Sequence, residues 1–163
     1  MTTMRPASAL IEALGLAPHP EGGFFRELYR DPATAPHPAS GEPRSCVTCI
    51  YFLLERGTFS ALHRVAQTEI WHHLDGGPLE IATLSDAGAA ARVTLGKHIE
   101  AAEVLQYVVP AGVWQAAAPT ADWALVGCTV APGFDFADFE MPGRAELLAL
   151  FPREAALIEQ FTR

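Results

Sequence analysis

The stretch TFSALHRVAQTEIWHHLDGG, residues 58–77, decides the predicted fold. Residues 58–65 alternate as a β-strand does, and the alternation puts His63 on a face with small and apolar side chains. Residues 69–74 predict the neighbouring strand, which begins with Glu69, and the two glycines that follow predict a tight turn. A histidine and a glutamate on adjacent strands are where a barrel would build a polar centre inside an apolar wall.

Short apolar runs separated by turn residues continue on both sides of this stretch. Runs with strand character occupy residues 24–30, 45–54, 79–84, 92–95, 104–109 and 123–130, and turn signals lie at 55–57, 75–78, 85–88 and 110–112. Many short strands separated by turns are typical of an all-β sandwich or barrel. The sequence therefore predicts an all-β fold.

Both ends of the chain have helical rather than strand character. Ser8 can cap a short helix over residues 9–14, and Gly15 can end it because glycine tolerates the left-handed conformation that ends helices. From Arg144 the apolar positions follow a helical period. We expect one or two short helices there, packed outside the barrel and broken near Pro152.

The size of the chain is that of one domain. Of its 163 residues, 50% are hydrophobic, which is enough for a sizeable core. Residues 31–44 are rich in Pro, Ala, Ser and Gly, which predicts a mobile surface loop rather than a linker between domains. We therefore predict a single domain over residues 1–163.

Charge and hydropathy exclude two classes of partner. The formal net charge is −8, and the lysines and arginines are scattered along the chain, which argues against a nucleic-acid-binding surface. The N-terminal segment lacks the apolar run of a signal peptide, and no later run approaches the length of a membrane span. We expect a soluble, cytoplasmic protein with neither nucleic acid nor membrane as partner.

Two of the three cysteines, Cys46 and Cys49, have the CxxC spacing of redox and zinc pairs. They fall in an expected strand, residues 45–54, in which positions three apart face opposite sides. We therefore interpret them as buried, reduced thiols of a cytosolic protein.

A third polar residue, Gln115, is expected on the same wall as His63 and Glu69. The turn PAGVW precedes Gln115, which we expect to point to the same centre. Trp71 and Trp114 adjoin these positions, and their large apolar surfaces make them candidate walls for a bound ligand.

These segments resemble the cupin superfamily, whose two motifs are HxHxxx(x)E…G and PxGxxH. The motif positions fall on His63, Val65, Glu69 and Gly76 and on Pro110, Gly112 and Gln115. The blocks HPEGGF (19–24), SALHRV (60–65), EIWH (69–72), VPAGVWQ (109–115) and VAPGFDF (130–136) are similar to the DUF985 (Cupin_5) subfamily. The resemblance implies a cupin jelly-roll barrel, commonly a homodimer, with a cavity at its centre for a small-molecule ligand.

The departures from the cupin pattern bear on the cofactor. Metal-dependent cupins hold Fe, Mn, Ni or Zn with three histidines and a glutamate, and here the places of the second and third histidine fall on Val65 and Gln115. His63, Glu69 and a neutral amide would form a poor metal site, because imidazole supplies most of the affinity for a borderline transition metal. No cofactor is therefore favoured.

A divalent transition metal is the alternative if another histidine joins this set. Alternation puts His73 on the face of Glu69, whereas His72 reaches that face only if the strand carries a bulge. Such a centre, with open ligand positions, would fit a cupin dioxygenase or decarboxylase.

Without a metal, His63 and Glu69 form a proton-transfer pair in an apolar cavity. Burial would raise the pKa of Glu69 and lower that of His63, and their mutual attraction would act in the opposite direction. Sugar-nucleotide epimerases of the superfamily use a metal-free histidine base with a tyrosine acid. The resemblance thus implies an isomerase or epimerase of a sugar-like substrate, with Tyr51 or Tyr107 as the acid. The third interpretation is a non-catalytic ligand-binding or sensor module.

Two further segments have structural interpretations. The glycines that follow Glu21 let the chain reverse or bring the turn over the barrel mouth. The acidic residues of the segment 134–140 alternate with phenylalanines, which favours a half-buried extended segment over a cation-binding loop.

Overall fold

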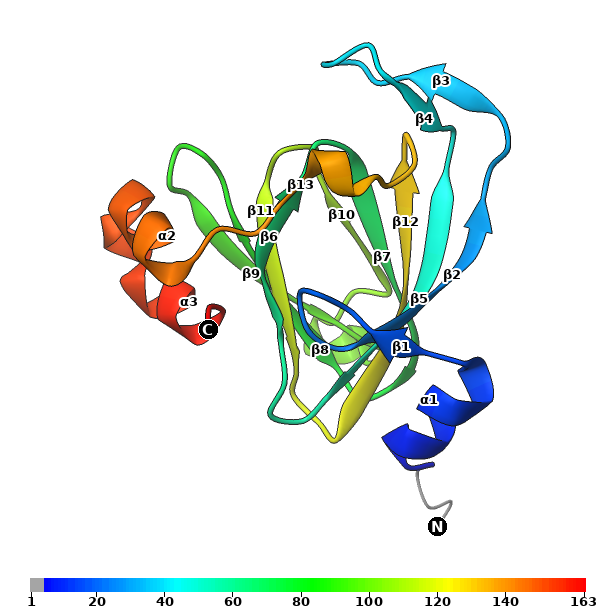
Figure 1. The fold of residues 1–163 in the computed structure, drawn as a ribbon. Helices are drawn as coiled ribbons and strands as arrows, with labels where there is room; N and C mark the ends of the chain where they lie inside the picture. The colour runs from blue at the N-terminus through cyan, green and yellow to red at the C-terminus, as the bar shows by residue number, and fades with distance from the viewer. Residues whose placement is uncertain (1–4) are drawn as a thin grey trace.

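The computed structural model describes residues 5–163, which form two antiparallel sheets that face each other as a barrel (Figure 1). The six-stranded sheet has the order β1 (Ala17–Pro18), β2 (Phe24–Arg30), β5 (Thr48–Glu55), β12 (Trp123–Ala131), β7 (Thr68–Gly76) and β10 (Gln106–Val109). The five-stranded sheet has the order β13 (Phe139–Glu140), β6 (Ser60–Val65), β11 (Trp114–Pro119), β8 (Leu79–Leu84) and β9 (Ala90–Leu95). The chain passes from one sheet to the other between β5, β6, β7 and β8, as in a jelly roll. The predicted all-β class is confirmed.

The core lies between the sheets and consists of the inward-facing side chains of both. Phe52, Trp71, Leu79, Ile81 and Val126 belong to it, and each is at most 1% exposed. Burying one such large side chain contributes roughly 1.5–3 kcal/mol to folding, so these alternating positions stabilise the two-sheet packing.

The N-terminal helix α1 (Ala7–Leu14) ends as predicted at Gly15, whose φ of 63° is the left-handed conformation. Its beginning differs from the prediction, because Pro6 occupies the cap position and Ser8 lies inside the helix. The fixed φ of proline suits a helix start without a side-chain cap. The helix packs through Leu10 on Trp123 of β12.

The C-terminal helices cover the outer face of the five-stranded sheet (Figure 1). The predicted break at Pro152 is confirmed, and the elements are α2 (Arg144–Leu150), the 3₁₀ turn η3 (Pro152–Glu154) and α3 (Ala155–Gln160). Leu147 and Phe161, both fully buried, pack there with Leu62 and Trp114 of the sheet. Within residues 5–163, no helix combines the length and apolar character that crossing a membrane requires.

The segment expected as a mobile surface loop contains a short hairpin, β3 (Thr34–Pro36) with β4 (Pro43–Ser45), that projects beyond the barrel (Figure 1). The composition misled the prediction because Pro36 ends β3 and Pro43 begins β4, positions where proline is tolerated in a strand. The remaining short elements are the 3₁₀ turns η1 (Ile99–Ala101) and η2 (Phe136–Asp138). Since η2 interrupts residues 134–140, that segment is extended only in part. All three cysteines are free thiols, but Cys46 and Cys49 are partly rather than fully buried, and Cys46 precedes β5.

Candidate active site

A cavity of about 260 Å³ lies between the two sheets. Its ionisable lining residues are His19, Glu21, Glu27, Arg30, His63, Glu69, Cys128 and Asp135, and its phenylalanines are Phe25, Phe52, Phe134 and Phe136. The cavity thus joins a cluster of ionisable groups to an aromatic wall, and it contains His63 and Glu69 as the sequence predicted.

His63 projects from β6 into this cavity and is 2% exposed. Its Nδ1 lies 2.7 Å from the carbonyl oxygen of Ala61, which can only accept, so Nδ1 carries the proton of the neutral ring. The other nitrogen, Nε2, therefore has a free lone pair, and it lies 3.2 Å from Oε2 of Glu21. The backbone of β6 thus fixes the tautomer that can accept a proton.

Glu21 reaches His63 from the turn between β1 and β2 and is 7% exposed. The hydroxyl of Ser60 donates to Oε1 of Glu21 over 2.9 Å. The next residue, Gly22, has a φ of 109°, and a Cβ there would lie 2.2 Å from the carbonyl oxygen of Phe59. Glycine is required at that position for the turn to pack this closely on the barrel and hold Glu21 inside it.

Burial sets the protonation of this pair. It raises the pKa of Glu21 to about 8 and lowers the pKa of His63. Both changes favour the uncharged forms, so near pH 7 the carboxylic acid of Glu21 faces a neutral imidazole across 3.2 Å. In these forms the carboxyl of Glu21 can donate a proton and Nε2 of His63 can accept one.

Glu69 on β7 is the second buried carboxyl of the cavity, and burial raises its pKa to about 7. Nε2 of Gln115 donates to Oε2 of Glu69 over 2.6 Å. The indole of Trp71 donates to Oε1 of the same amide over 2.8 Å. Because an indole N–H can only donate, it fixes the amide with its oxygen toward Trp71 and its NH₂ toward Glu69.

His19 is the second imidazole of the cluster. Its Nδ1 accepts the backbone N–H of Glu21 over 3.2 Å and lies 3.6 Å from Oε2 of that residue. The ring stands edge-on to Phe25 with centroids 4.6 Å apart. Burial lowers the pKa of His19 to about 4, so the ring is neutral over the physiological range.

Three predicted residues, His63, Glu69 and Gln115, come together as expected, but the two tryptophans have other environments. Trp71 is fully buried in the core and holds the amide of Gln115. Trp114 faces the C-terminal helices, with the guanidinium of Arg64 4.3 Å above its ring. Strand alternation explains this, because Trp114 and Gln115 are neighbours on β11 and must face opposite sides.

The remaining predicted residues do not line the cavity. Tyr51 and His72 lie in a groove on the outer face of the six-stranded sheet, where Nε2 of His72 is 3.1 Å from the hydroxyl of Thr129. Tyr107 packs against the apolar core, and Nε2 of His73 donates to the carbonyl oxygen of Gly77 at the end of β7. Neither tyrosine is placed to act as the acid, and neither histidine extends the cluster.

Sequence reasoning missed His19 and Glu21 as site residues. Both belong to a turn, and no periodic pattern indicates that a turn folds back over a barrel. The two glycines after Glu21 were the available signal. They indicate a turn that reverses the chain or lies over the barrel mouth, but they do not show that Glu21 points into the cavity.

The donor set does not fit the metal of metal-dependent cupins. The amide of Gln115 presents N–H groups to Glu69, and its oxygen is already hydrogen-bonded to Trp71. Val65 supplies no donor atom. Within residues 5–163, no group of three or more His, Cys, Asp or Glu side chains is arranged to hold a metal ion.

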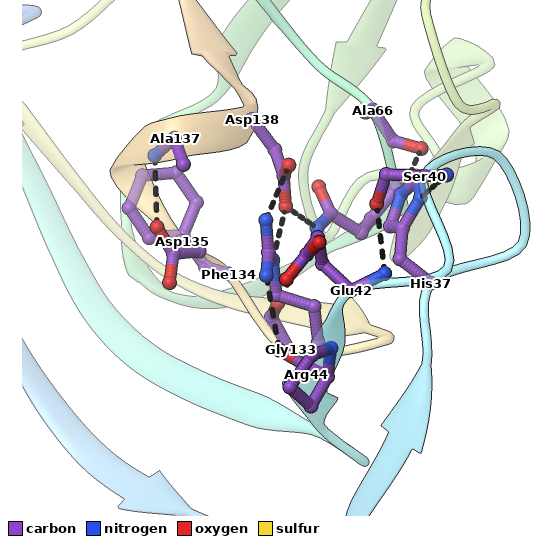
Figure 2. Close-up of polar contacts among 12 residues, drawn as sticks. His37, Ser40, Glu42, Arg44, Ala66, Gly133, Phe134, Asp135, Ala137 and Asp138 are labelled. Atoms are coloured by element: carbon purple, nitrogen blue, oxygen red, sulfur yellow. Dashed lines mark hydrogen bonds and ion pairs between the residues drawn. The ribbon is translucent and has the colours of Figure 1, made fainter.

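Polar contacts dock the hairpin and the η2 segment on the barrel (Figure 2). Nε and Nη2 of Arg44 donate to the two oxygens of Asp138 over 2.7 and 2.9 Å, and Gln67 donates to the same carboxylate. Nε2 of His37 donates to the carbonyl oxygen of Ala66 over 3.1 Å. These contacts fix the segment that carries Phe134 and Phe136, two walls of the cavity.

Comparisons with known proteins agree with this architecture. A hypothetical protein from Leishmania major has a similar structure, with a TM-score of 0.92 and 33% identity over 97% of this chain and 99% of that one. A protein from Shewanella oneidensis is similar with a TM-score of 0.90 and 37% identity, covering 98% and 99% of the two chains. The uncharacterized protein YML079W of Saccharomyces cerevisiae is 31% identical in an alignment of 162 positions that covers 90% of this chain and 81% of that protein.

The sequence profile of one family matches residues 8–142, a range that contains the turn of Glu21 and the strands of His63, Glu69 and Gln115. The two solved structures share the fold over nearly their whole length. The chain therefore belongs to the DUF985 (Cupin_5) family of the cupin superfamily.

Proposed function

We propose that this cupin binds a small polar molecule in its barrel and moves a proton on it without a metal, as an isomerase or epimerase of a sugar-like substrate. The observation that carries the proposal is the buried pair of His63 and Glu21, with Nε2 and Oε2 3.2 Å apart inside the cavity. Perturbed ionisable groups that converge in an apolar pocket are typical of acid–base sites.

The proposed step is enolisation of a carbonyl compound. The lone pair on Nε2 of His63 takes a proton from the carbon next to the carbonyl, while the carboxyl of Glu21 gives its proton to the carbonyl oxygen. The products are a neutral enol and an imidazolium–carboxylate pair whose charges compensate each other in the buried site. Return of a proton to the other face or to the neighbouring carbon gives the epimer or isomer and restores both groups.

Glu69 acts on this step through its charge. A negative charge on Glu69 raises the pKa of His63 and so favours the imidazolium form that the step produces. Gln115, held by Trp71, keeps the carboxylate oriented. The role first assigned to Tyr51 or Tyr107 passes to Glu21, because that carboxyl lies in the cavity and retains its proton near neutrality.

The test is exchange of carbon-bound hydrogen in D₂O, followed by NMR over a panel of small aldoses, ketoses and cyclic ketones. We expect the wild type to introduce deuterium next to the carbonyl of at least one compound. His63→Gln and Glu21→Gln should lose this exchange while circular dichroism shows them folded. Binding of a panel compound without exchange would refute the isomerase and leave the non-catalytic binding or sensor module.

A metal-dependent dioxygenase or decarboxylase is the competing proposal. Elemental analysis of protein purified without a polyhistidine tag separates the two. Stoichiometric Fe, Mn, Ni or Zn, combined with loss of activity on removal of the metal, would overturn the metal-free mechanism.

A further inference from the structure

The charges around the cavity limit the ligand of the proposed site. Of the described residues that line the cavity, Arg30 alone carries a permanent positive charge. Its Nε and Nη2 donate to the two carboxylate oxygens of Glu27, each over 2.9 Å, and Nη2 also donates to the carbonyl oxygen of Phe134 over 3.0 Å. These three hydrogen bonds engage Nε and Nη2, and the carboxylate of Glu27 compensates the charge of the guanidinium, which weakens it as a site for a second anion.

The other charges of the lining are negative or absent. Asp135 adds an acidic group, and the carboxyls of Glu21 and Glu69 lie deeper in the cavity. Burial keeps His19 and His63 in their neutral forms near pH 7. A phosphate in this cavity would lose its hydration and meet carboxyl groups without a free cation, which is unfavourable.

The walls favour a ring with an apolar face. Phe25, Phe52, Phe134 and Phe136 line the cavity, and the rings of Phe134 and Phe136 stand edge-to-face with centroids 4.9 Å apart. Aromatic walls of this kind bind flat apolar faces, whether of an aromatic ring or the C–H face of a saturated one. The cavity of about 260 Å³ lies near the lower end of the size range of small-molecule sites.

We infer that the ligand is an uncharged, unphosphorylated ring compound that lays an apolar face against the phenylalanines and directs a carbonyl or hydroxyl group to His63 and Glu21. This inference rests on the proposed function, whose substrate class it narrows. The pairing of Arg30 with Glu27 and the acidic lining disfavour phosphorylated sugars and sugar nucleotides as ligands.

The test compares benzyl alcohol with benzyl phosphate, which share a ring and differ in the charge of the polar group. We expect saturation-transfer NMR titrations at pH 7 to show that the wild type binds benzyl alcohol at least about tenfold more tightly than the phosphate. Glu27→Gln frees Arg30 from its carboxylate partner, so the preference for benzyl alcohol over benzyl phosphate should be smaller in that variant. Val65→Phe, which fills part of the cavity, should weaken binding of the alcohol.

Equal or tighter binding of benzyl phosphate by the wild type overturns the inference. So does the absence of benzyl alcohol binding at millimolar concentration, or binding that Val65→Phe leaves unchanged in a folded protein. The proposed function is judged separately by deuterium exchange, so exchange on a phosphorylated sugar would refute the ligand class while supporting the chemistry. Binding of the ring compound without any deuterium exchange would support the ligand class and refute the proposed chemistry.

Discussion

Nε2 of His63 lies 3.2 Å from Oε2 of Glu21, although the histidine belongs to the five-stranded sheet and the glutamate to a turn of the six-stranded sheet. The pair therefore spans the two layers of the barrel inside the cavity. The chemistry proposed for the protein depends on this contact.

Replacing the acid should separate catalysis from folding. Glu21→Gln keeps the size of the side chain and a hydrogen-bond acceptor for Ser60, but it removes the proton that the carboxyl donates. We expect deuterium exchange to fall by about a hundred- to ten-thousand-fold, the usual contribution of one acid–base group. Glu12→Gln on the exposed surface of α1 is the matched control and should leave the rate unchanged. A Glu21→Gln variant with the wild-type rate would contradict the assignment.

The same carboxyl makes stability depend on pH. Burial raises the pKa of Glu21 from 4.5 to about 8, so between these values the folded state holds a proton that the unfolded state releases. Stability therefore falls as pH rises through this window, by at most about 1.4 kcal/mol per pH unit for one group. Glu69, with a pKa of about 7, contributes in the same direction up to that pH.

Urea titrations between pH 6.5 and 8 measure this effect. The lowered pKa values of His19 and His63 make stability rise with pH, in the opposite direction, and this effect fades above 6.5, the pKa of an unfolded imidazole. The free energy of unfolding should fall across the range, and Glu21→Gln should flatten the slope. Equal slopes in the two proteins would show that Glu21 is already ionised at pH 6.5.

Local alternation explains how much of the site could be predicted. It placed His63, Glu69 and Gln115 on inward faces, and the register of β11 against β6 pairs Gln115 with His63. The same rule, applied strictly, excludes Trp114 from the cavity wall, because Trp114 adjoins Gln115 on the strand and faces the helices. Glu21 could not be placed this way, since its position depends on how a turn docks across the barrel, a contact between segments distant in sequence.

The contact between Arg44 and Asp138 should control access to the cavity. Arg44→Ala removes both hydrogen bonds from Arg44 to Asp138, and the partly buried carboxylate of Asp138 loses its cation (Figure 2). We expect a lower melting temperature and weaker binding of benzyl alcohol. Arg56→Ala breaks an exposed ion pair with Asp122 and serves as the control, with little change in either measurement. Unchanged binding in Arg44→Ala would mean that the segment is held by other contacts.

Restoring the two missing histidines should create metal affinity. Val65→His with Gln115→His would supply the imidazoles that the wild type lacks beside His63 and Glu69. We expect the double variant to bind Co²⁺ with visible absorption bands, whereas wild type and Val65→His alone bind it weakly. Strong Co²⁺ binding by the wild type, lost in His63→Ala, would show that the present donor set suffices.

The outer face of the six-stranded sheet should be the contact between two copies of the chain, which we propose to be a homodimer. Helix α1 covers one end of this face, near Trp123, and the rest carries a groove with the half-exposed side chains of Leu28, Leu74 and Leu105. No described residue of the groove is a lysine, arginine, aspartate or glutamate. In a chain with a net charge of −8, such an uncharged apolar surface is where two copies approach with least repulsion.

Light scattering at micromolar concentration should therefore give the mass of two chains. Leu74→Glu places a charge in the centre of the contact, and we expect it to give monomers. Leu150→Glu changes a leucine that is 57% exposed on α2, outside this face, and should remain dimeric. A monomeric wild type would remove the proposal. Dissociation of the dimer by Leu150→Glu but not by Leu74→Glu would move the interface to the helices, because only the face that is buried between the two copies is sensitive to an added charge.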